Sequence, residues 1–135
     1  MPQYADSIFV IAIIIATVVI QALVAARAHR KQDHYIPGVV APELDHHSFV
    51  FRSNRTFMNS LENVPLFVVT ALLAMFAGVD ANTLYIVTSV FAAARIVHMT
   101  LFYKIATNEN PSPRSYFYLI GLITQMVLLG LIFAA

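Results

Sequence analysis

Four stretches of this chain are apolar over the length needed to cross a lipid bilayer, and they constrain its fold more than any other feature. A spanning α-helix needs about 20 mainly apolar residues, and we expect helices at about 7–30, 48–79, 81–104 and 113–135. The chain is 59% hydrophobic and 11% charged, whereas soluble domains contain about 25% charged residues. We therefore expect a single domain spanning all 135 residues, an all-α integral membrane protein folded as a bundle of four transmembrane helices.

The basic residues predict how the bundle is oriented. All eight Lys and Arg residues lie in or near the polar stretches 27–55 and 104–114, and the N-terminal tail and the turn near Asp80 carry none. Because basic loops stay on the cytoplasmic side, we expect loops 27–55 and 104–114 to be cytoplasmic and both termini to lie outside. The net charge of +1 is too small to indicate nucleic-acid binding. The chain has no cysteine, so thiol chemistry would require an external thiol.

A polar stripe runs along the start of the second apolar segment. Its members are Arg52, Arg55, Asn59 and Glu62, and their spacings of three, four and three place them on one helix face. Ionisable groups inside a membrane are costly and face the protein interior or a watery cavity. One interpretation is an ion pair from Arg55 to Glu62 by way of Asn59 that holds neighbouring helices. The other is a site for a small zwitterionic ligand, since guanidinium groups bind carboxylates and Glu62 would bind an ammonium group.

The start of the fourth helix has the composition of an anion site. Ser112 is placed to cap the helix, Pro113 suits its first position, and Arg114 and Ser115 fall in its first turn. A helix N-terminus offers free N–H groups and a partial positive charge, which would favour a thiolate over a thiol. Alternatively, Arg114 extends to lipid phosphate and Ser115 only caps the helix. Tyr118 lies on the face of Ser115 and could donate a further hydrogen bond.

The third segment ends with more polar and aromatic residues. Arg95, His98 and Phe102 share a helix face, while Tyr103 is turned about 100° from Phe102. We expect His98 to be a packed histidine, and Tyr103 to be an anchor at the membrane interface with a possible ligand contact. No histidine pair has helical i, i+4 spacing with a third ligand, so no metal site is expected.

Three motifs together resemble the MAPEG family, the membrane-associated proteins in eicosanoid and glutathione metabolism. Residues 51–67 are similar to the family's Arg-x-x-x-Asn-x-x-Glu-x-x-Pro pattern, and residues 94–98 and 113–118 match motifs of the third and fourth helices. The resemblance extends over nearly the whole chain. The chain looks more like the prokaryotic type than the eicosanoid type, which implies a multi-pass protein of the bacterial inner membrane. It also implies a homotrimer that binds glutathione, as co-substrate, between neighbouring subunits near the cytoplasmic face.

The resemblance also assigns roles to residues. Arg114 and Ser115 match the positions that hold and activate the thiolate. Arg55, Asn59, Glu62, Arg95 and Tyr118 match the family's glutathione contacts, and Arg27 and Arg30 match its basic contacts more loosely. The polar stripe and the end of the third segment add Arg52, His98 and Tyr103 to the predicted contacts. The chain departs from the family at Phe102, where some members have a tyrosine, and at Asn63, which is often aromatic or hydrophobic elsewhere.

The expected function is therefore a membrane-bound glutathione transferase that conjugates lipophilic electrophiles in detoxification, with possible glutathione-dependent peroxidase activity. The alternative from another class is a non-catalytic binding or assembly protein with the same fold. A small transporter is a third reading, but the sequence lines no pore with polar residues.

Overall fold

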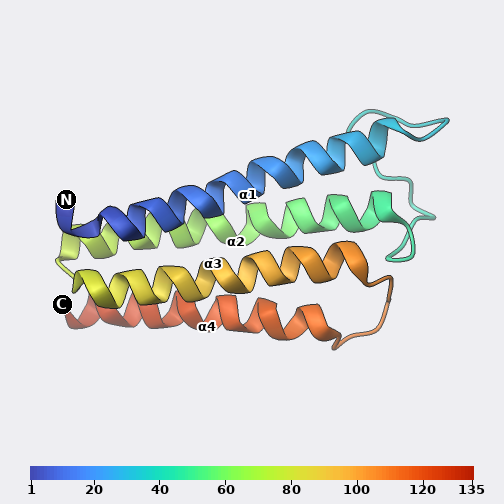
Figure 1. Ribbon diagram of the computed structural model, residues 1–135. Helices are drawn as coiled ribbons and strands as arrows, with labels where there is room; N and C mark the ends of the chain where they lie inside the picture. The colour runs from blue at the N-terminus through green and yellow to red at the C-terminus, as the bar shows by residue number, and fades with distance from the viewer.

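The computed structural model describes all 135 residues as one elongated bundle of four long helices (Figure 1). Each helix is long and apolar enough to cross a membrane, which confirms the predicted four-span architecture. The first helix begins two residues before its expected start, because the chain enters it directly from the preceding 3-10 helix. The second is shorter than expected at both ends, because Ser48 and Gly78 are its capping residues. A short 3-10 helix, Pro2–Tyr4, precedes α1 (Ala5–Arg30), α2 (Phe49–Ala77), α3 (Ala81–Lys104) and α4 (Pro113–Ala134).

The turn between α2 and α3 is tight because its residues suit both helix ends. Gly78 adopts a left-handed conformation with φ 79°, which a residue without Cβ accepts without strain. The Val79 N–H then donates to the Ala74 carbonyl at 3.0 Å, closing the end of α2. Asp80 caps α3 by accepting from the Thr83 N–H at 2.8 Å. The two helices therefore reverse direction within a few residues.

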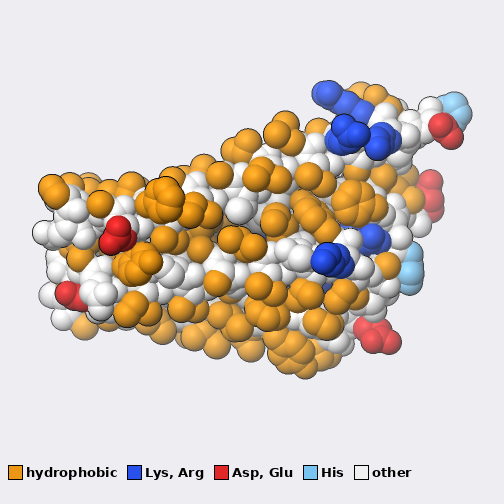
Figure 2. Space-filling model, in the orientation of Figure 1, with side chains coloured by type: hydrophobic (Ala, Val, Ile, Leu, Met, Phe, Trp, Pro, Cys, Tyr) orange, Lys and Arg blue, Asp and Glu red, His pale blue; other side chains and the backbone are white.

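Two helices, α2 and α3, form the middle of the bundle, because each of them packs against all three other helices. Of the outer helices, α1 contacts both α2 and α3, and α4 packs mainly on α3. Both chain termini lie at one end of the bundle, and the two longer loops, 31–48 and 105–112, lie at the other (Figure 1). The visible Lys and Arg side chains gather toward this loop end (Figure 2). The charge asymmetry predicted along the sequence is therefore an asymmetry between the two ends of the molecule.

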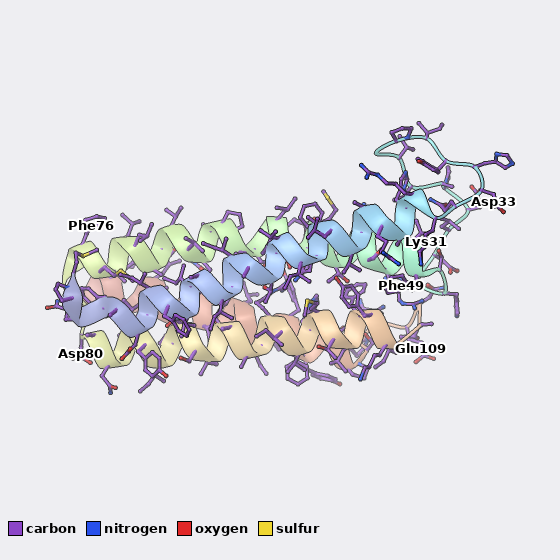
Figure 3. The ribbon with its side chains drawn as sticks, turned by 45° about the horizontal axis from the view of Figure 1, so that its top comes forward. Lys31, Asp33, Phe49, Phe76, Asp80 and Glu109 are labelled. Atoms are coloured by element: carbon purple, nitrogen blue, oxygen red, sulfur yellow. The ribbon has the colours of Figure 1, made fainter.

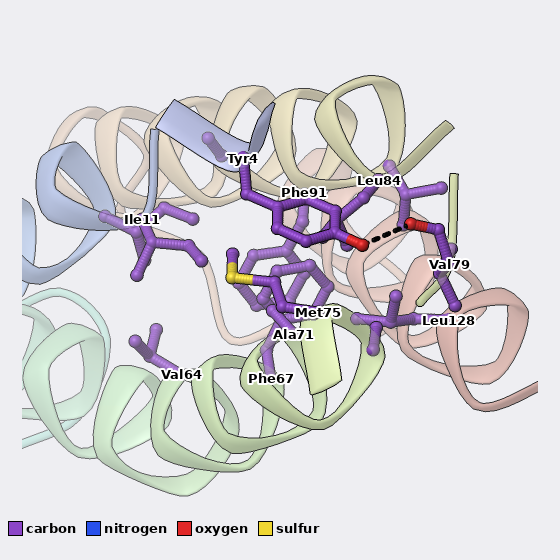
Figure 4. Packing of buried hydrophobic residues seen from close by; sticks show 14 residues of the cluster. Tyr4, Ile11, Val64, Phe67, Ala71, Met75, Val79, Leu84, Phe91 and Leu128 are labelled. Atoms are coloured by element: carbon purple, nitrogen blue, oxygen red, sulfur yellow. Dashed lines mark hydrogen bonds between the residues drawn. The ribbon is translucent and has the colours of Figure 1, made fainter. Parts of the chain in front are cut away.

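An apolar core fills the half of the bundle nearest the termini (Figure 4). At its centre, the rings of Phe67 on α2 and Phe91 on α3 stack with centroids 3.7 Å apart and planes 3° from parallel. Tyr4 closes this end, because its hydroxyl donates to the Val79 carbonyl at 2.9 Å. These contacts determine how α2 and α3 are rotated against each other, and so which of their residues meet further along.

The interior of the other half is polar. The buried side chains there carry charges, amides and hydroxyls, which is costly in a membrane protein unless the groups find partners. Some of these groups bond within their own helix, as Ser53 and Thr56 do, whereas the arginines bond to other elements of the fold. The set comprises Arg52, Ser53, Thr56, Asn59 and Ser60 of α2, Arg95 and His98 of α3, and Arg114 of α4.

Candidate functional site

A buried arginine joins α3 to the polar stripe of α2. Arg95 is 3% exposed, and its Nη2 donates to Asn59 Oδ1 at 2.7 Å and to Ser60 Oγ at 3.1 Å. Both acceptors are themselves buried. Charge-assisted bonds of this kind are stronger than neutral ones, especially away from water. The side chain of Asn59 is therefore held in one place by a neighbouring helix.

Arg55 and Glu62 form an ion pair on the outer surface of α2. Arg55 Nη1 lies 3.3 Å from Glu62 Oε1, and the two side chains are 38% and 53% exposed. The pair is direct: Asn59 does not bridge it, because the Asn59 amide oxygen is bonded to Arg95. Two charged groups thus stand on the open face of a membrane-spanning helix, beside the amide that Arg95 holds. An exposed pair contributes little stability, so both side chains are free to exchange partners.

The side chain of Arg52 does not join the Arg55–Glu62 pair of the polar stripe. Its side chain is buried, and it donates to the carbonyls of His46 at 2.8 Å, His47 at 3.1 Å and Tyr103 at 3.4 Å. These bonds tie the first loop and the end of α3 to α2. The spacing predicts that Arg52 joins Arg55 and Glu62, but the structure places its guanidinium in a clamp at the loop end.

Arg114 lies at the start of α4, as the capping pattern predicts, with Ser112 in the N-cap position. Its guanidinium donates to the carbonyls of Thr107 at 2.8 Å and Ile105 at 3.4 Å. It also stacks 4.3 Å from the centroid of the Phe102 ring, a favourable cation–π geometry. These contacts hold a positive charge at the start of α4. They use only part of the five N–H donors of the guanidinium, so the remaining donors are available to a ligand.

Ser115 takes part in the capping of α4. Its hydroxyl oxygen accepts from the Ser112 N–H at 3.1 Å, and the hydroxyl donates weakly to Asn110 Oδ1 at 3.4 Å. The capping role that the sequence left open is therefore present. Tyr118, one turn further along, is exposed, and its hydrogen bond to a ligand stays a prediction.

His98 and Tyr103 are packed aromatic residues beside this group. The His98 ring lies 5.3 Å from Phe102 and is 2% exposed, as expected for a packed histidine. Tyr103 packs edge-on to Phe49 at 5.6 Å. Neither His98 Nδ1 nor the Tyr103 hydroxyl has a hydrogen-bond partner, although both are buried. Buried polar atoms normally find partners, so these two retain capacity for a further bond.

The basic residues of α1 lie apart from the polar stripe. Arg30 borders a cavity of about 490 Å³ between α1, the first loop and α2, whose wall also includes His29, Asn54 and Phe57. Arg27 and Arg30 both border a second hollow on the outer side of α1. Within one chain, then, Arg27 and Arg30 form no bond to Arg55, Asn59 or Glu62.

A polar network joins the two loops, and sequence reasoning missed it. Asn108 Oδ1 accepts from the His46 N–H at 3.1 Å and lies 3.0 Å from His46 Nδ1, while its Nδ2 donates to Asp45 Oδ2 at 2.9 Å. The Asn108 bond, with help from the His47 backbone, lowers the pKa of Asp45 to about 2. Burial lowers the pKa of His46 below its ordinary value. Phe49, which follows the first loop, and Glu109, in the second, lie at the same end of the bundle in Figure 3.

The contacts of two further residues in the site were not predicted from the sequence. Ser60 is an acceptor for Arg95, and Phe102 is the surface on which Arg114 stacks. A signal for Ser60 existed in the sequence, because it is a small polar residue next to Asn59 in the polar part of the second helix. Phe102 was on the predicted face with Arg95 and His98, but its contact with the fourth helix had no signature.

The fold and the site define a class of protein: a multi-pass membrane bundle with charged and amide side chains on α2 and α3 in the half of the bundle nearest the loops. The model of the MAPEG family matches residues 7–134, and the chain belongs to this family. The family includes glutathione transferases and peroxidases as well as members without enzymatic activity. No curated protein and no solved structure matches this chain.

Proposed function

We propose that this protein is a membrane-bound glutathione transferase that conjugates glutathione to lipophilic electrophiles. The observation that carries the proposal is the open face of α2, where the Arg55–Glu62 pair stands beside an amide fixed by Arg95. Charged side chains left open on a membrane-spanning helix are costly unless they meet water, a ligand or a partner. Membership of a family that contains glutathione transferases supports glutathione as the ligand.

The chemistry of glutathione suits these groups. The tripeptide has two carboxylates, one ammonium group and one thiol, so it needs cations, an anion and a place for sulfur. Arg55 supplies a guanidinium for a carboxylate, and Glu62 supplies a carboxylate for the ammonium. Because their mutual ion pair is exposed and weak, a zwitterionic ligand can replace it without a large loss of stability.

The start of α4 would hold the sulfur. Arg114 places a fixed positive charge at a helix N-terminus, and Ser115 offers a hydroxyl in the same turn. Both favour the thiolate over the thiol, so the proton leaves to solvent. The thiolate attacks the electrophilic carbon of the second substrate, a C–S bond forms, and the leaving group departs with its electron pair. The protein contributes orientation and electrostatic stabilisation.

We propose a homotrimer as the working assembly. Glu62 and Arg55 are exposed on a single chain, and Arg27 and Arg30 stand apart from them on α1. A neighbouring copy that lays its α1 basic residues near the α2 face of the next would enclose the ligand between subunits. The basic loop end would face the cytoplasm of a bacterial inner membrane and both termini would face outward, in accord with the positive-inside rule.

Turnover by the purified protein tests the proposal. The assay measures glutathione consumption with an aryl chloride, an α,β-unsaturated carbonyl and a lipid hydroperoxide. The variants are Glu62→Gln and Arg114→Ala, with Lys104→Ala as the control, because Lys104 is an exposed cation at the same membrane face. We expect conjugation that both site variants lower at least about tenfold, a typical loss for one charged contact.

Three other results would redirect the proposal. Turnover of the hydroperoxide alone would assign a peroxidase. Glutathione binding without turnover of any substrate would assign a non-catalytic binding role. Equal activity in Arg114→Ala and Lys104→Ala would remove Arg114 from the mechanism.

A further inference from the structure

The bond between Arg95 and Asn59 determines which way the Asn59 amide points. An asparagine side chain can be turned over so that its oxygen and nitrogen exchange places. Arginine has five N–H donors and no acceptor, so only Oδ1 can face Arg95 Nη2 at 2.7 Å. The Nδ2 group must therefore point away from Arg95. This orientation follows from the chemistry of the two groups and needs no assignment of hydrogens.

The bond between Arg95 and Asn59 is buried, so we expect it to stay intact when a ligand binds or leaves. Arg95 is 3% exposed and also donates to Ser60 Oγ, which is 1% exposed. Asn59 is 8% exposed, so only a small part of its side chain reaches the open face. Turning the amide over would set Nδ2 against a buried guanidinium and leave Oδ1 without its donor, which is costly away from water.

We propose that Arg95 is a positioning residue that makes Asn59 a dedicated hydrogen-bond donor, so that the ligand atom at Asn59 is an acceptor oxygen. This inference rests on the proposed function, because the ligand is taken to be glutathione. It assigns Arg95 an indirect role, whereas the family resemblance predicts that Arg95 contacts the ligand itself. A carboxylate or carbonyl oxygen of the ligand accepts the hydrogen bond from Asn59 Nδ2. The ammonium group of the ligand binds elsewhere.

The polarity of the neighbouring groups agrees with this assignment. Arg55 can only donate and ionised Glu62 can only accept. They lie four residues before and three residues after Asn59, about 6 Å and 4.5 Å along the helix axis. Fixing Asn59 as a donor gives the face an ordered pattern of donor, donor and acceptor. Without Arg95, the Asn59 amide could turn over and bind either a donor or an acceptor atom of the ligand. The face would then no longer select an acceptor at this position.

The test compares glutathione with its two monoamides, in which one carboxylate becomes a primary amide. Binding is measured by calorimetry to wild-type protein and to Asn59→Asp, in which the new carboxylate keeps the bond to Arg95 but has no donor. We expect glutathione to bind wild type better than at least one monoamide. In Asn59→Asp that preference should fall about tenfold or more or reverse, because the amide N–H₂ of the ligand can donate to the carboxylate.

Variants of Arg95 separate positioning from a structural role. Arg95→Met frees the Asn59 amide, so the preference should shrink, whereas Arg95→Lys keeps a donor to Oδ1 and should restore it. Where Arg95→Met fails to fold, Asn59→Asp still tests the donor role of Asn59, and Arg95→Lys tests whether a donor at position 95 is sufficient. Unchanged preference for both monoamides in Asn59→Asp would overturn the inference while leaving the proposed function intact. A wild-type protein that does not bind glutathione would overturn the proposed function, and this inference with it.

Discussion

Arg52 and Arg55 lie three residues apart, yet the structure predicts opposite consequences for their loss. Arg52 holds three carbonyls of the loop end at 2.8, 3.1 and 3.4 Å. Hydrogen bonds from a charged group contribute about 1.5–3 kcal/mol each, and the third is long and weak. After allowing for the burial of the charge, we expect Arg52→Met to lower the free energy of unfolding by about 3 kcal/mol, or about 150-fold in the folded-to-unfolded ratio.

Arg55→Met is the matched variant. Arg55 makes one ion pair of 3.3 Å with side chains that are 38% and 53% exposed, and such pairs contribute about 0–1 kcal/mol. Its loss should leave stability near wild type and weaken glutathione binding about tenfold, because a carboxylate loses its guanidinium. The two substitutions remove the same side chain, so differences between them report position alone.

The assay pairs unfolding by sodium dodecyl sulfate in mixed micelles with hydrogen exchange of the first loop. The Ser48 N–H, bonded to the Asp45 carbonyl at 3.0 Å, should lose protection in Arg52→Met and keep it in Arg55→Met. Wild-type stability in Arg52→Met, together with a loss of glutathione affinity as large as that of Arg55→Met, would refute the reasoning. Arg52 would then be a ligand contact, as its spacing alone predicts.

Two further predictions concern the core and the loops. Phe67→Ala removes one ring of the 3.7 Å stack with Phe91 and should destabilise the bundle by about 3–5 kcal/mol through the cavity that it leaves. The same unfolding titration measures this loss, with Phe133→Ala, at an exposed phenylalanine, as the control. The loop network should loosen on acidification: burial lowers the pKa of His46, so its contribution is complete above the ordinary pKa of 6.5 and declines as pH falls below it. Hydrogen exchange between pH 7.5 and pH 5 should show this decline, and His46→Gln should abolish it; an equal decline in the variant would contradict the assignment.

Much of the fold was predictable because it follows from local rules. Apolar length specifies a spanning helix, and the Ser112-Pro113 pair and Asp80 mark helix starts by their own capping chemistry. The gathering of cations at one end of the bundle follows from connecting these spans in order. None of these features depends on how one helix is rotated against another.

The contacts of the site depend on that rotation and were less predictable. Asn59 and Arg95 are 36 residues apart, and they meet because the stacking of Phe67 on Phe91 orients α2 and α3. Spacing placed Arg52 on the face of Arg55 but carried no information about carbonyls in a loop that folds back over the helix. Asn108 in the second loop bonds to His46 in the first, 62 residues away. The sequence of a polar connecting segment does not indicate such a partner.

The most direct test of the central claim is the ultraviolet difference spectrum of the purified protein during titration with glutathione. Since the chain has no cysteine, a thiolate band can come only from the ligand. We expect a saturable thiolate signal near neutral pH in wild type and in Lys104→Ala, its loss in Arg114→Ala and its partial recovery in Arg114→Lys. Glutathione binding by calorimetry with no thiolate signal, or a signal unchanged in Arg114→Ala, would contradict the claim that the start of α4 activates the thiol.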